Sequence, residues 1–350
     1  MNETNNPSIQ MTNTERILEV KHLKKFFPIT KGFRKKHVGD VRAVDDLNLY
    51  INKGETLGLV GESGCGKTTA SRCILRAYEP TAGDILYRTK TGVTVNLSQM
   101  SNKELRPLRA EMQMIFQDPY GSLNPRMNIF EIVSEPMLVN GIKNRRERED
   151  RVAELLTKVG LRPEYMVRYP HSFSGGQRQR IGIARALALQ PNLVVADEPV
   201  SALDVSVQAQ VLNLLMELLE EMNLTYLFVA HDLSVVRHIC DRVTVMYVGK
   251  VVETASTEAL YNTPRHPYTE ALMASIPIPD PRLQQNREGL PGEVPNPSNP
   301  PSGCYFHPRC SYCIDKCKTE MPELKEIEPQ HWTACHRAEE LKLEGFHKNE

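Results

Sequence analysis

The sequence predicts an α/β domain followed by a smaller, cysteine-rich C-terminal extension. Two short apolar runs, "PNLVVADEP" (residues 191–199) and "LTYLFVAHD" (224–232), end in acidic or polar residues, which is typical of buried parallel strands. Between them, apolar residues from Val207 to Met222 recur at helical spacing. Strands that alternate with helices indicate an α/β sheet. Five of the eight cysteines crowd between Cys304 and Cys335.

The composition narrows the class of protein. The 350 residues include 43 Lys or Arg and 43 Asp or Glu. The chain therefore has no excess of basic residues that would indicate nucleic-acid binding. Apolar residues make up 40% of the chain, enough for a sizeable core. No apolar run approaches the roughly 18 residues that span a bilayer, and the polar start "MNETNNPSIQ" lacks the apolar core of a secretion signal. We therefore expect a protein of the cytoplasm, even if it works at a membrane.

The elements are expected in the following order. Residues 1–16 are a flexible start, and 17–60 are rich in strands around an exposed basic loop, "PITKGFRKKHVG" (28–39). Helical patterns dominate residues 103–190, and "VTVMYVGKVVETA" (243–255) forms a closing hairpin. Residues 277–303 are proline-rich and predicted to be irregular. The predicted domains are 17–260, with a helical subdomain at about 100–190, and an extension at 261–350.

A phosphate-binding loop lies at residues 61–69. Gly61, Gly66, Lys67 and Thr68 fit G-x-x-x-x-G-K-[ST], between an apolar strand and a helical run. The loop turns its N–H groups toward phosphates, Lys67 adds positive charge, and the Thr68 hydroxyl can bind Mg²⁺. The rest of the predicted nucleotide-binding set here is Glu62, Ser63, Gly64, Cys65 and Thr69.

Two carboxylates end the strand predicted at 193–197. Asp197 can hold Mg²⁺ directly or through water, and Glu198 is placed to polarise the attacking water. Together with the loop they indicate phosphoryl-transfer chemistry, in which positioning and charge stabilisation carry most of the catalysis.

A second anion site is predicted at "FSGGQ", residues 173–177. Ser174, Gly175, Gly176 and Gln177 precede a helical run, and a serine, two glycine amides and a helix N-terminus can bind a phosphate. A simple helix cap would also begin with serine. A cap does not call for two consecutive glycines, which weaken a helix.

The chain resembles ABC-type ATPases. The phosphate loop, Gln117 in "IFQDP", "FSGGQ", "VVADEP", "SALD" (201–204) and His231 in "VAHD" occur in that family's order over about 200 residues. The resemblance implies a P-loop NTPase fold with a RecA-like core and a helical subdomain. It also implies two domains packed head to tail, with each ATP between one domain's loop and the other's SGGQ segment. Phe173 replaces the usual leucine.

The resemblance assigns further roles. Gln117 would contact Mg²⁺ or water and sense a transmembrane partner, His231 would touch the γ-phosphate, and Asp204 would bridge to the opposite domain. With Glu198, Gln117 and His231 form the predicted catalytic set. An aromatic residue would stack on adenine; we select Phe27, with Phe26 as the alternative.

Two segments resemble ATP-binding subunits of oligopeptide and dipeptide importers. They are "TPRHPYTEALMASIPIPDP" (263–281) and the basic loop before Val41, which looks like that of the second, F-type member of two unlike ATPases. The implied partners are a second, non-identical ATPase, two membrane-spanning permeases and, indirectly, an extracellular peptide-binding protein. The subunit would lie peripherally on the cytoplasmic face of the cell membrane. An importer for nickel or another small solute is the alternative.

The C-terminal cysteines have the spacing of a metal site. Thiolates at such close intervals can surround one soft metal centre. The resemblance to importer subunits implies a [4Fe–4S] cluster on Cys304, Cys310, Cys317 and Cys335, with Cys313 as an extra thiol. Zinc is the rival, with His307, His331 and His336 nearby, and free thiols are a third possibility.

Two other classes of function are weighed against the importer ATPase. Soluble ABC proteins that act on ribosomes or DNA often carry two cassettes or a long coiled coil, and this chain has neither. A regulatory protein that binds ATP without turnover is disfavoured by Glu198 beside Asp197 and by the complete "FSGGQ".

Overall fold

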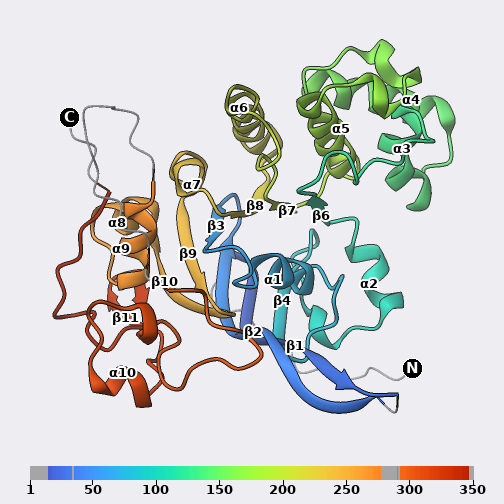
Figure 1. The fold of residues 1–350 in the computed structure, drawn as a ribbon. Coiled ribbons are helices and arrows are strands. Elements are labelled where there is room, and N and C mark those ends of the chain that lie inside the picture. Colours follow the sequence, from blue (N-terminus) through green and yellow to red (C-terminus); the bar gives the residue numbers. More distant parts are fainter. Residues whose placement is uncertain (1–14, 34, 277–289, 291, 347–350) are drawn as a thin grey trace. The chain divides into compact units, whose positions relative to one another are not determined.

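The computed structural model describes residues 15–33, 35–276, 290 and 292–346, which divide into two compact units (Figure 1). The ranges of unit 1 are 1–19, 50–55 and 85–229, and those of unit 2 are 20–49, 56–84 and 230–350. Most of the predicted flexible start, 1–16, and most of the proline-rich segment lie outside the described residues.

Unit 1 contains three parallel strands and a group of helices. Strand β7 (Leu193–Asp197) pairs with β6 (Met112–Ile115) on one side and with β8 (Thr225–Ala230) on the other. Every residue of β7 and β8 is buried, which explains why these runs are continuously apolar. Strand β4 (Ala82–Arg88) pairs antiparallel with β5 (Thr94–Asn96), with Tyr87 opposite Val95. The two parallel strands predicted here are confirmed.

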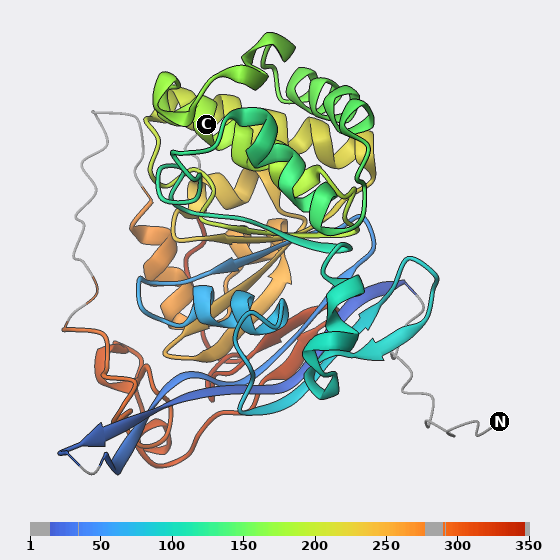
Figure 2. The ribbon, with the colours of Figure 1, turned by 90° about the vertical axis from the view of Figure 1, so that its right-hand side faces the viewer.

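The longer helices of unit 1 each begin at a capping side chain. The longer helices are α3 (Ile129–Val139), α4 (Arg145–Lys158), α5 (Gly175–Leu187) and α6 (Val205–Met222), capped by Asn128, Asn144, Ser174 and Asp204. The shorter ones are α2 (Asn102–Leu108), η1 (Leu97–Gln99), η2 (Pro163–Val167) and η3 (Pro170–Ser172). Helices α3, α4 and α5 pack on one another, as the green part of Figure 2 shows. The predicted helix face from Val207 to Met222 is confirmed, and its centre is buried.

Unit 2 is built on a mixed sheet. Strand β3 (Thr56–Val60) runs parallel to β9 (Arg242–Tyr247), and β9 pairs antiparallel with β10 (Lys250–Ser256), so the predicted closing hairpin is confirmed. The helices are α1 (Lys67–Ile74), α7 (Leu233–Ile239), α8 (Thr257–Asn262), α9 (Pro267–Ala274), α10 (Asp315–Thr319) and η4 (His307–Arg309). Pro267 is the first residue of α9, where a missing N–H costs nothing.

The C-terminal extension continues this sheet. Strand β12 (His331–Thr333) pairs with β10, and β11 (Lys325–Glu328) pairs with β12. The carboxylate of Glu253 on β10 is fully buried and accepts hydrogen bonds from the N–H groups of Arg265 (2.6 Å) and His266 (3.1 Å) and from His331 Nε2 (2.7 Å). The extension therefore supplies all three of these partners.

The prediction of an exposed basic loop at residues 28–39 is wrong in the extent of the loop. Strand β1 (Arg16–Lys31) and strand β2 (Lys36–Asn52) continue through most of it as two long strands, drawn in blue in Figure 2. The residues 28–39 include few apolar side chains and no apolar/polar alternation, so no strand is predicted here from the sequence. The prediction that this segment is exposed holds, and the side chain of Phe33 is fully exposed.

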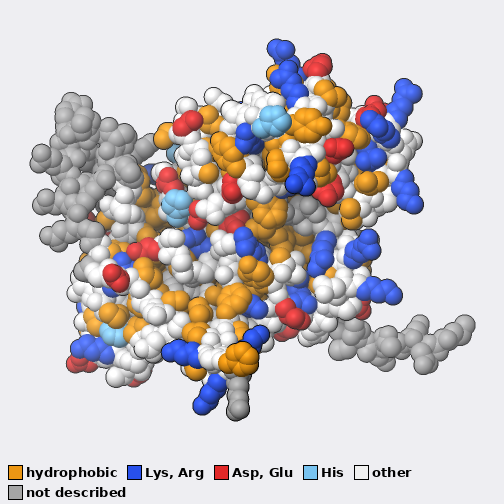
Figure 3. Space-filling view, turned by 45° about the vertical axis from the view of Figure 1, so that its right-hand side comes forward, with side chains coloured by type: hydrophobic (Ala, Val, Ile, Leu, Met, Phe, Trp, Pro, Cys, Tyr) orange, Lys and Arg blue, Asp and Glu red, His pale blue; other side chains and the backbone are white. Residues whose placement is uncertain are grey.

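The surface carries both signs of charge. Lys and Arg side chains are interspersed with Asp and Glu over the face that Figure 3 shows. Within the described ranges, every helix is too short or too polar to cross a bilayer.

Candidate nucleotide-binding site

The phosphate loop joins the buried strand β3 to helix α1 in unit 2. Gly61 and Gly66 have φ angles of +148° and +106°. A side chain on Gly66 would begin 2.0 Å from the carbonyl oxygen of Ala43, a backbone atom that cannot move aside. Only glycine fits there, and the loop can then turn tightly into the N-terminus of α1, whose first N–H groups have no partner within the helix. This is the anion-binding arrangement that the motif predicts.

The Lys67 side chain folds back over this loop. It is 4% exposed, and its Nζ donates hydrogen bonds to the carbonyl oxygens of Gly61 (2.7 Å) and Glu62 (3.1 Å). The cation is thus held at the loop by neutral acceptors that a phosphate oxygen could replace. Of the other predicted loop residues, the exposed ones are Ser63 and Gly64, and the half-buried ones are Thr68 and Thr69.

Cys65 lies in the middle of the loop but faces inward. Its side chain is 1% exposed, and burial raises the pKa of its thiol. The thiol is therefore uncharged at neutral pH and fills space beneath the loop rather than acting as a nucleophile.

Phe27 stands in an aromatic pair within unit 2. Its ring meets that of Tyr78 edge-on, with ring centroids 5.9 Å apart, and Lys25 Nζ lies 4.9 Å from the centre of the Phe27 ring. Phe26 is half-buried as well, with the Arg42 guanidinium 6.0 Å from its ring. Tyr78, in "AYEP" just after α1, is an aromatic neighbour that the sequence analysis did not select.

Gln117 and Glu198 meet in unit 1. The Gln117 amide Nε2 donates a hydrogen bond of 2.9 Å to Glu198 Oε2, although 81 residues separate them. Glu198 adopts a left-handed φ of +48°, and its N–H donates to Val229 O at 2.9 Å, so the chain turns directly after β7. Asp197, the last residue of β7, is 2% exposed. The structure thus joins two of the three predicted catalytic residues beside the predicted magnesium ligand.

Ser174 caps helix α5. Its hydroxyl accepts a hydrogen bond from Gln177 N (3.4 Å), and Gln177 Oε1 accepts one from Ser174 N (3.1 Å), which completes a capping box. In this box the Ser174 hydroxyl and the Gln177 carbonyl oxygen act only as acceptors. The Ser174 O–H can therefore still donate to an anion, together with the glycine amides and the helix N-terminus.

The two signature glycines differ in their surroundings. A side chain on Gly176 would meet Val207 Cγ1 of helix α6 at 2.3 Å, whereas one on Gly175 would find ordinary contacts, with Tyr120 Oη at 3.4 Å. Close packing of α5 against α6 thus accounts for one glycine without any ligand. The other has no such reason in its own chain.

Asp204 and His231 lie at element ends. Asp204 caps α6, and the hydrogen bonds from Val207 N (3.0 Å) and Ser206 Oγ (2.9 Å) hold the pKa of its carboxyl below the usual value. His231, directly after β8, has an exposed side chain in unit 2.

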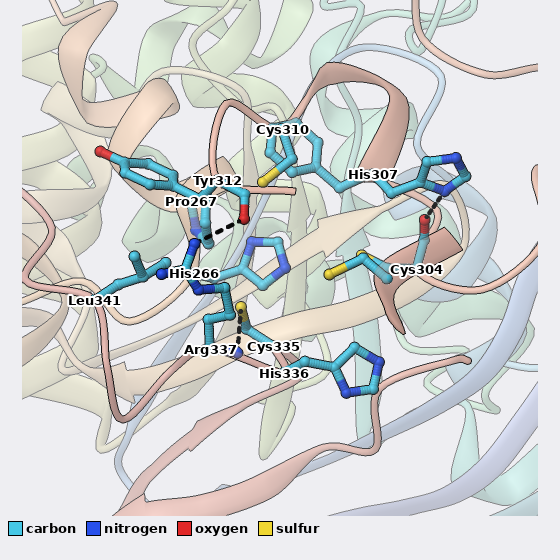
Figure 4. Close-up of a pocket in the computed structure, with 12 residues that line it drawn as sticks. His266, Pro267, Cys304, His307, Cys310, Tyr312, Cys335, His336, Arg337 and Leu341 are labelled. Carbon is cyan, nitrogen blue, oxygen red and sulfur yellow. Dashed lines mark hydrogen bonds between the residues drawn. The ribbon is translucent and has the colours of Figure 1, made fainter. Parts of the chain in front are cut away.

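Four cysteine side chains of the extension line one pocket in unit 2 (Figure 4). They are the four predicted ligands: Cys304, Cys310, Cys317 and Cys335. Cys313 is absent from the lining and is partly exposed. Burial raises the pKa of Cys304 to about 12 and those of Cys310 and Cys335 to about 11, so these thiols are protonated at neutral pH.

Two of the rival histidines, His307 and His336, line the same pocket, and each uses one ring nitrogen in a hydrogen bond, whereas His331 is not among the lining residues. His307 Nδ1 donates to Cys304 O (2.9 Å), His336 Nε2 donates to Glu320 O (3.0 Å), and His331 bonds to buried Glu253. Within the part of the chain that the structure describes, no three His, Cys, Asp or Glu side chains are grouped closely enough to hold a metal ion.

Two residues near the phosphate loop were missed by the sequence analysis. Arg309 forms an ion pair with Glu62, and Tyr268 Oη accepts a hydrogen bond from Glu62 N at 2.8 Å. Both come from segments more than 200 residues away, and no local pattern predicts such a contact.

Comparison with known proteins gives a consistent picture. A family model described as ABC transporter matches residues 44–201, and one described as oligopeptide/dipeptide transporter, C-terminal region, matches residues 252–317. The chain is 54% identical over 327 residues to the oligopeptide transport ATP-binding protein AppF of Bacillus subtilis (strain 168), covering 93% of this chain and 98% of the relative. It is 50% identical to the probable peptide ABC transporter ATP-binding protein y4tS of Sinorhizobium fredii, covering 92% and 90%.

Solved structures are similar over the ATPase part. The ATP-binding cassette MJ0796, in a dimeric post-hydrolysis state bound to ADP and Pi, is 29% identical with a TM-score of 0.59. The similarity covers 69% of this chain and 98% of that chain.

Proposed function

Since this chain belongs to the ATP-binding subunits of oligopeptide ABC importers and is an ABC transporter ATPase, we propose that it powers import by hydrolysing ATP in sites shared with a partner. The fold, the ATPase activity and the peptide-import class predicted from the sequence are confirmed. The match of residues 252–317 to the oligopeptide/dipeptide transporter region carries the transport assignment.

In the proposed site, each chain supplies half of the groups that hold ATP. The phosphate loop with Lys67 and Thr68 would bind the phosphates and Mg²⁺, and Asp197 would complete the metal coordination. The N-terminus of α5 would face the γ-phosphate in the partner's loop. The dimeric state of MJ0796 bound to ADP and Pi supports this arrangement.

Glu198 would be the group that polarises the attacking water. The hydrogen bond from Gln117 fixes this carboxylate at the end of β7, directly after Asp197. Glu198→Gln keeps the shape and can still accept from Gln117, so we expect ATP binding to stay and turnover to fall about 10²- to 10⁴-fold. Turnover within threefold of wild type in the assembled transporter would remove Glu198 from this role.

The proposed assembly contains a second, unlike ATPase and two permeases, and receives peptide from an extracellular binding protein. This subunit would lie on the cytoplasmic face of the membrane. Affinity isolation from membranes, followed by mass spectrometry, tests the assignment. Two multispanning proteins and one further ATPase are expected, whereas ribosomal or nucleic-acid partners would overturn it.

The four pocket cysteines are proposed to hold a [4Fe–4S] cluster, with zinc as the alternative. The donor set has the right chemistry, because four thiols line one cavity and Cys313 is not part of its lining, but the four sulfur atoms would have to move closer together to bind one metal centre. Such a cluster would supply a structural crosslink. After anaerobic reconstitution, Cys310→Ser is expected to abolish the brown colour and iron content, while the matched Cys313→Ser retains both. A colourless protein with stoichiometric zinc would reject iron.

A further inference from the structure

The C-terminal extension contacts the phosphate loop through one buried arginine. Arg309 Nη1 donates to Glu62 Oε2 (2.7 Å), and Nη2 donates to Glu62 Oε1 (3.0 Å), which forms a two-pronged ion pair. The Arg309 side chain is 5% exposed and that of Glu62 is 25% exposed. The hydrogen bonds to Glu62 raise the pKa of Arg309 above its usual value, so the guanidinium is charged at every physiological pH.

This contact is held by a rigid aromatic cluster. Tyr247 Oη accepts a further hydrogen bond from Arg309 Nη1 (3.3 Å), and Tyr268 Oη accepts from Glu62 N. The Tyr247 and Tyr268 rings are 4.6 Å apart, and Phe306 packs 5.3 Å from each. Glu62 is thus fixed twice from the extension, at its backbone and at its carboxylate.

The electrostatic consequence concerns the nucleotide. Glu62 places a negative charge in a loop that has to accept a polyphosphate, and like charges at close range repel. The Arg309 guanidinium neutralises the charge of the Glu62 carboxylate through their ion pair. Because Glu62 and Tyr247 occupy both of its terminal nitrogens, Arg309 acts through Glu62 rather than on the phosphates.

We propose that Arg309 and Tyr268 make the C-terminal extension part of the nucleotide site, with Arg309 as a positioning residue that neutralises Glu62 and fixes the start of the phosphate loop. ATP affinity then depends on a segment that lies outside the ATPase motifs. The inference deepens the proposed function but concerns nucleotide binding by the single subunit, so it stands or falls separately from peptide import.

The test is a double-mutant cycle on the full-length chain, titrated with fluorescent analogues of ATP and ADP. Arg309→Gln exposes an unpaired carboxylate to the phosphates, and we expect it to weaken ATP binding about tenfold or more. The effect should be larger for ATP than for ADP and larger at low salt, because it is electrostatic. Glu62→Gln in the Arg309→Gln background should restore most of the affinity.

Two further variants keep the test decisive. Arg265, which pairs with Glu328 in the same extension, offers a matched control, and Arg265→Gln is expected to bind ATP within twofold of wild type. Arg309→Lys keeps a positive charge beside Glu62 but loses the two-pronged geometry, so it should bind ATP more tightly than Arg309→Gln even if the latter folds poorly. The proposal is overturned if the double variant is no better than Arg309→Gln, if ATP and ADP lose affinity equally, or if Arg309→Lys binds ATP no more tightly than Arg309→Gln.

Discussion

Two glycines of the same helix are predicted to respond in opposite ways to alanine. On α5, a Cβ at Gly176 would lie 2.3 Å from Val207 Cγ1, while a Cβ at Gly182 would meet nothing within 4 Å. Ordinary contact begins near 3.4 Å, so Gly176→Ala forces a displacement of about 1 Å between α5 and α6. Val207 is β-branched and stiff, so it cannot rotate away freely.

The magnitude follows from two opposing terms. Overpacking lowers the stability of the packed helix by about 1–3 kcal/mol. Replacing a helical glycine with alanine raises helix stability by about 1 kcal/mol. Gly176→Ala is thus expected to destabilise α5 by about 0–2 kcal/mol, and Gly182→Ala to stabilise it by about 1 kcal/mol. The two variants should differ by about 1–3 kcal/mol.

Hydrogen exchange of the α5 amides is the suitable assay, because a chain of this size need not unfold in one step. The expected difference corresponds to exchange roughly 5- to 150-fold faster in Gly176→Ala than in Gly182→Ala. Adding Val207→Ala to Gly176→Ala should recover protection through a favourable coupling. Equal protection in the two single variants would refute the packing explanation.

Four other outcomes are expected. Lys67→Ala should weaken ATP binding at least about tenfold, because charge-assisted bonds to phosphate are lost; unchanged affinity in a nucleotide titration would contradict its assignment. Ser174→Arg should impair hydrolysis at the partner's loop and spare nucleotide binding at its own, with Ser174→Ala as the control for the lost cap, and a mixed-dimer assay that shows the reverse would refute the shared site. Burial raises the pKa of the Cys73 thiol to about 11, so roughly a thousandth of the Cys73 side chains are thiolate at pH 8. Iodoacetamide should therefore label the partly exposed Cys313 long before the buried Cys73. Since the unfolded thiol ionises near pH 9, Cys73 should also lower the free energy of unfolding as pH rises from 9 toward 11, an effect absent in Cys73→Ala when stability is measured across that range.

Local signals were enough for much of the architecture. A buried strand such as β7 can be predicted from an unbroken run of apolar residues. Helix α6 can be predicted from apolar residues that recur at helical spacing. The loop from Gly61 to Thr68 is readable because one short segment contains all of its parts. The capping box of α5 is equally local, since Ser174 and Gln177 are three residues apart.

What the sequence could not provide depends on contacts distant along the chain. Glu62 meets Arg309 across 247 residues, and Gly176 meets Val207 through the packing of two helices. The strand pairing of β12 with β10 leaves only short, weakly patterned runs in the sequence. Such contacts follow from the closed fold, and no spacing rule anticipates them.

The way the C-terminal extension joins β10 means that the cassette cannot simply be trimmed back to its ATPase motifs. Truncation of the chain after residue 260 would expose the hydrogen-bonding edge of β10 that now pairs with β12. An exposed strand edge of this kind can pair with a strand of another molecule. It would also remove the three hydrogen-bond donors of the buried Glu253 carboxylate and leave this charge without partners. The chain truncated after residue 260 is therefore expected to aggregate rather than to remain a working ATPase domain.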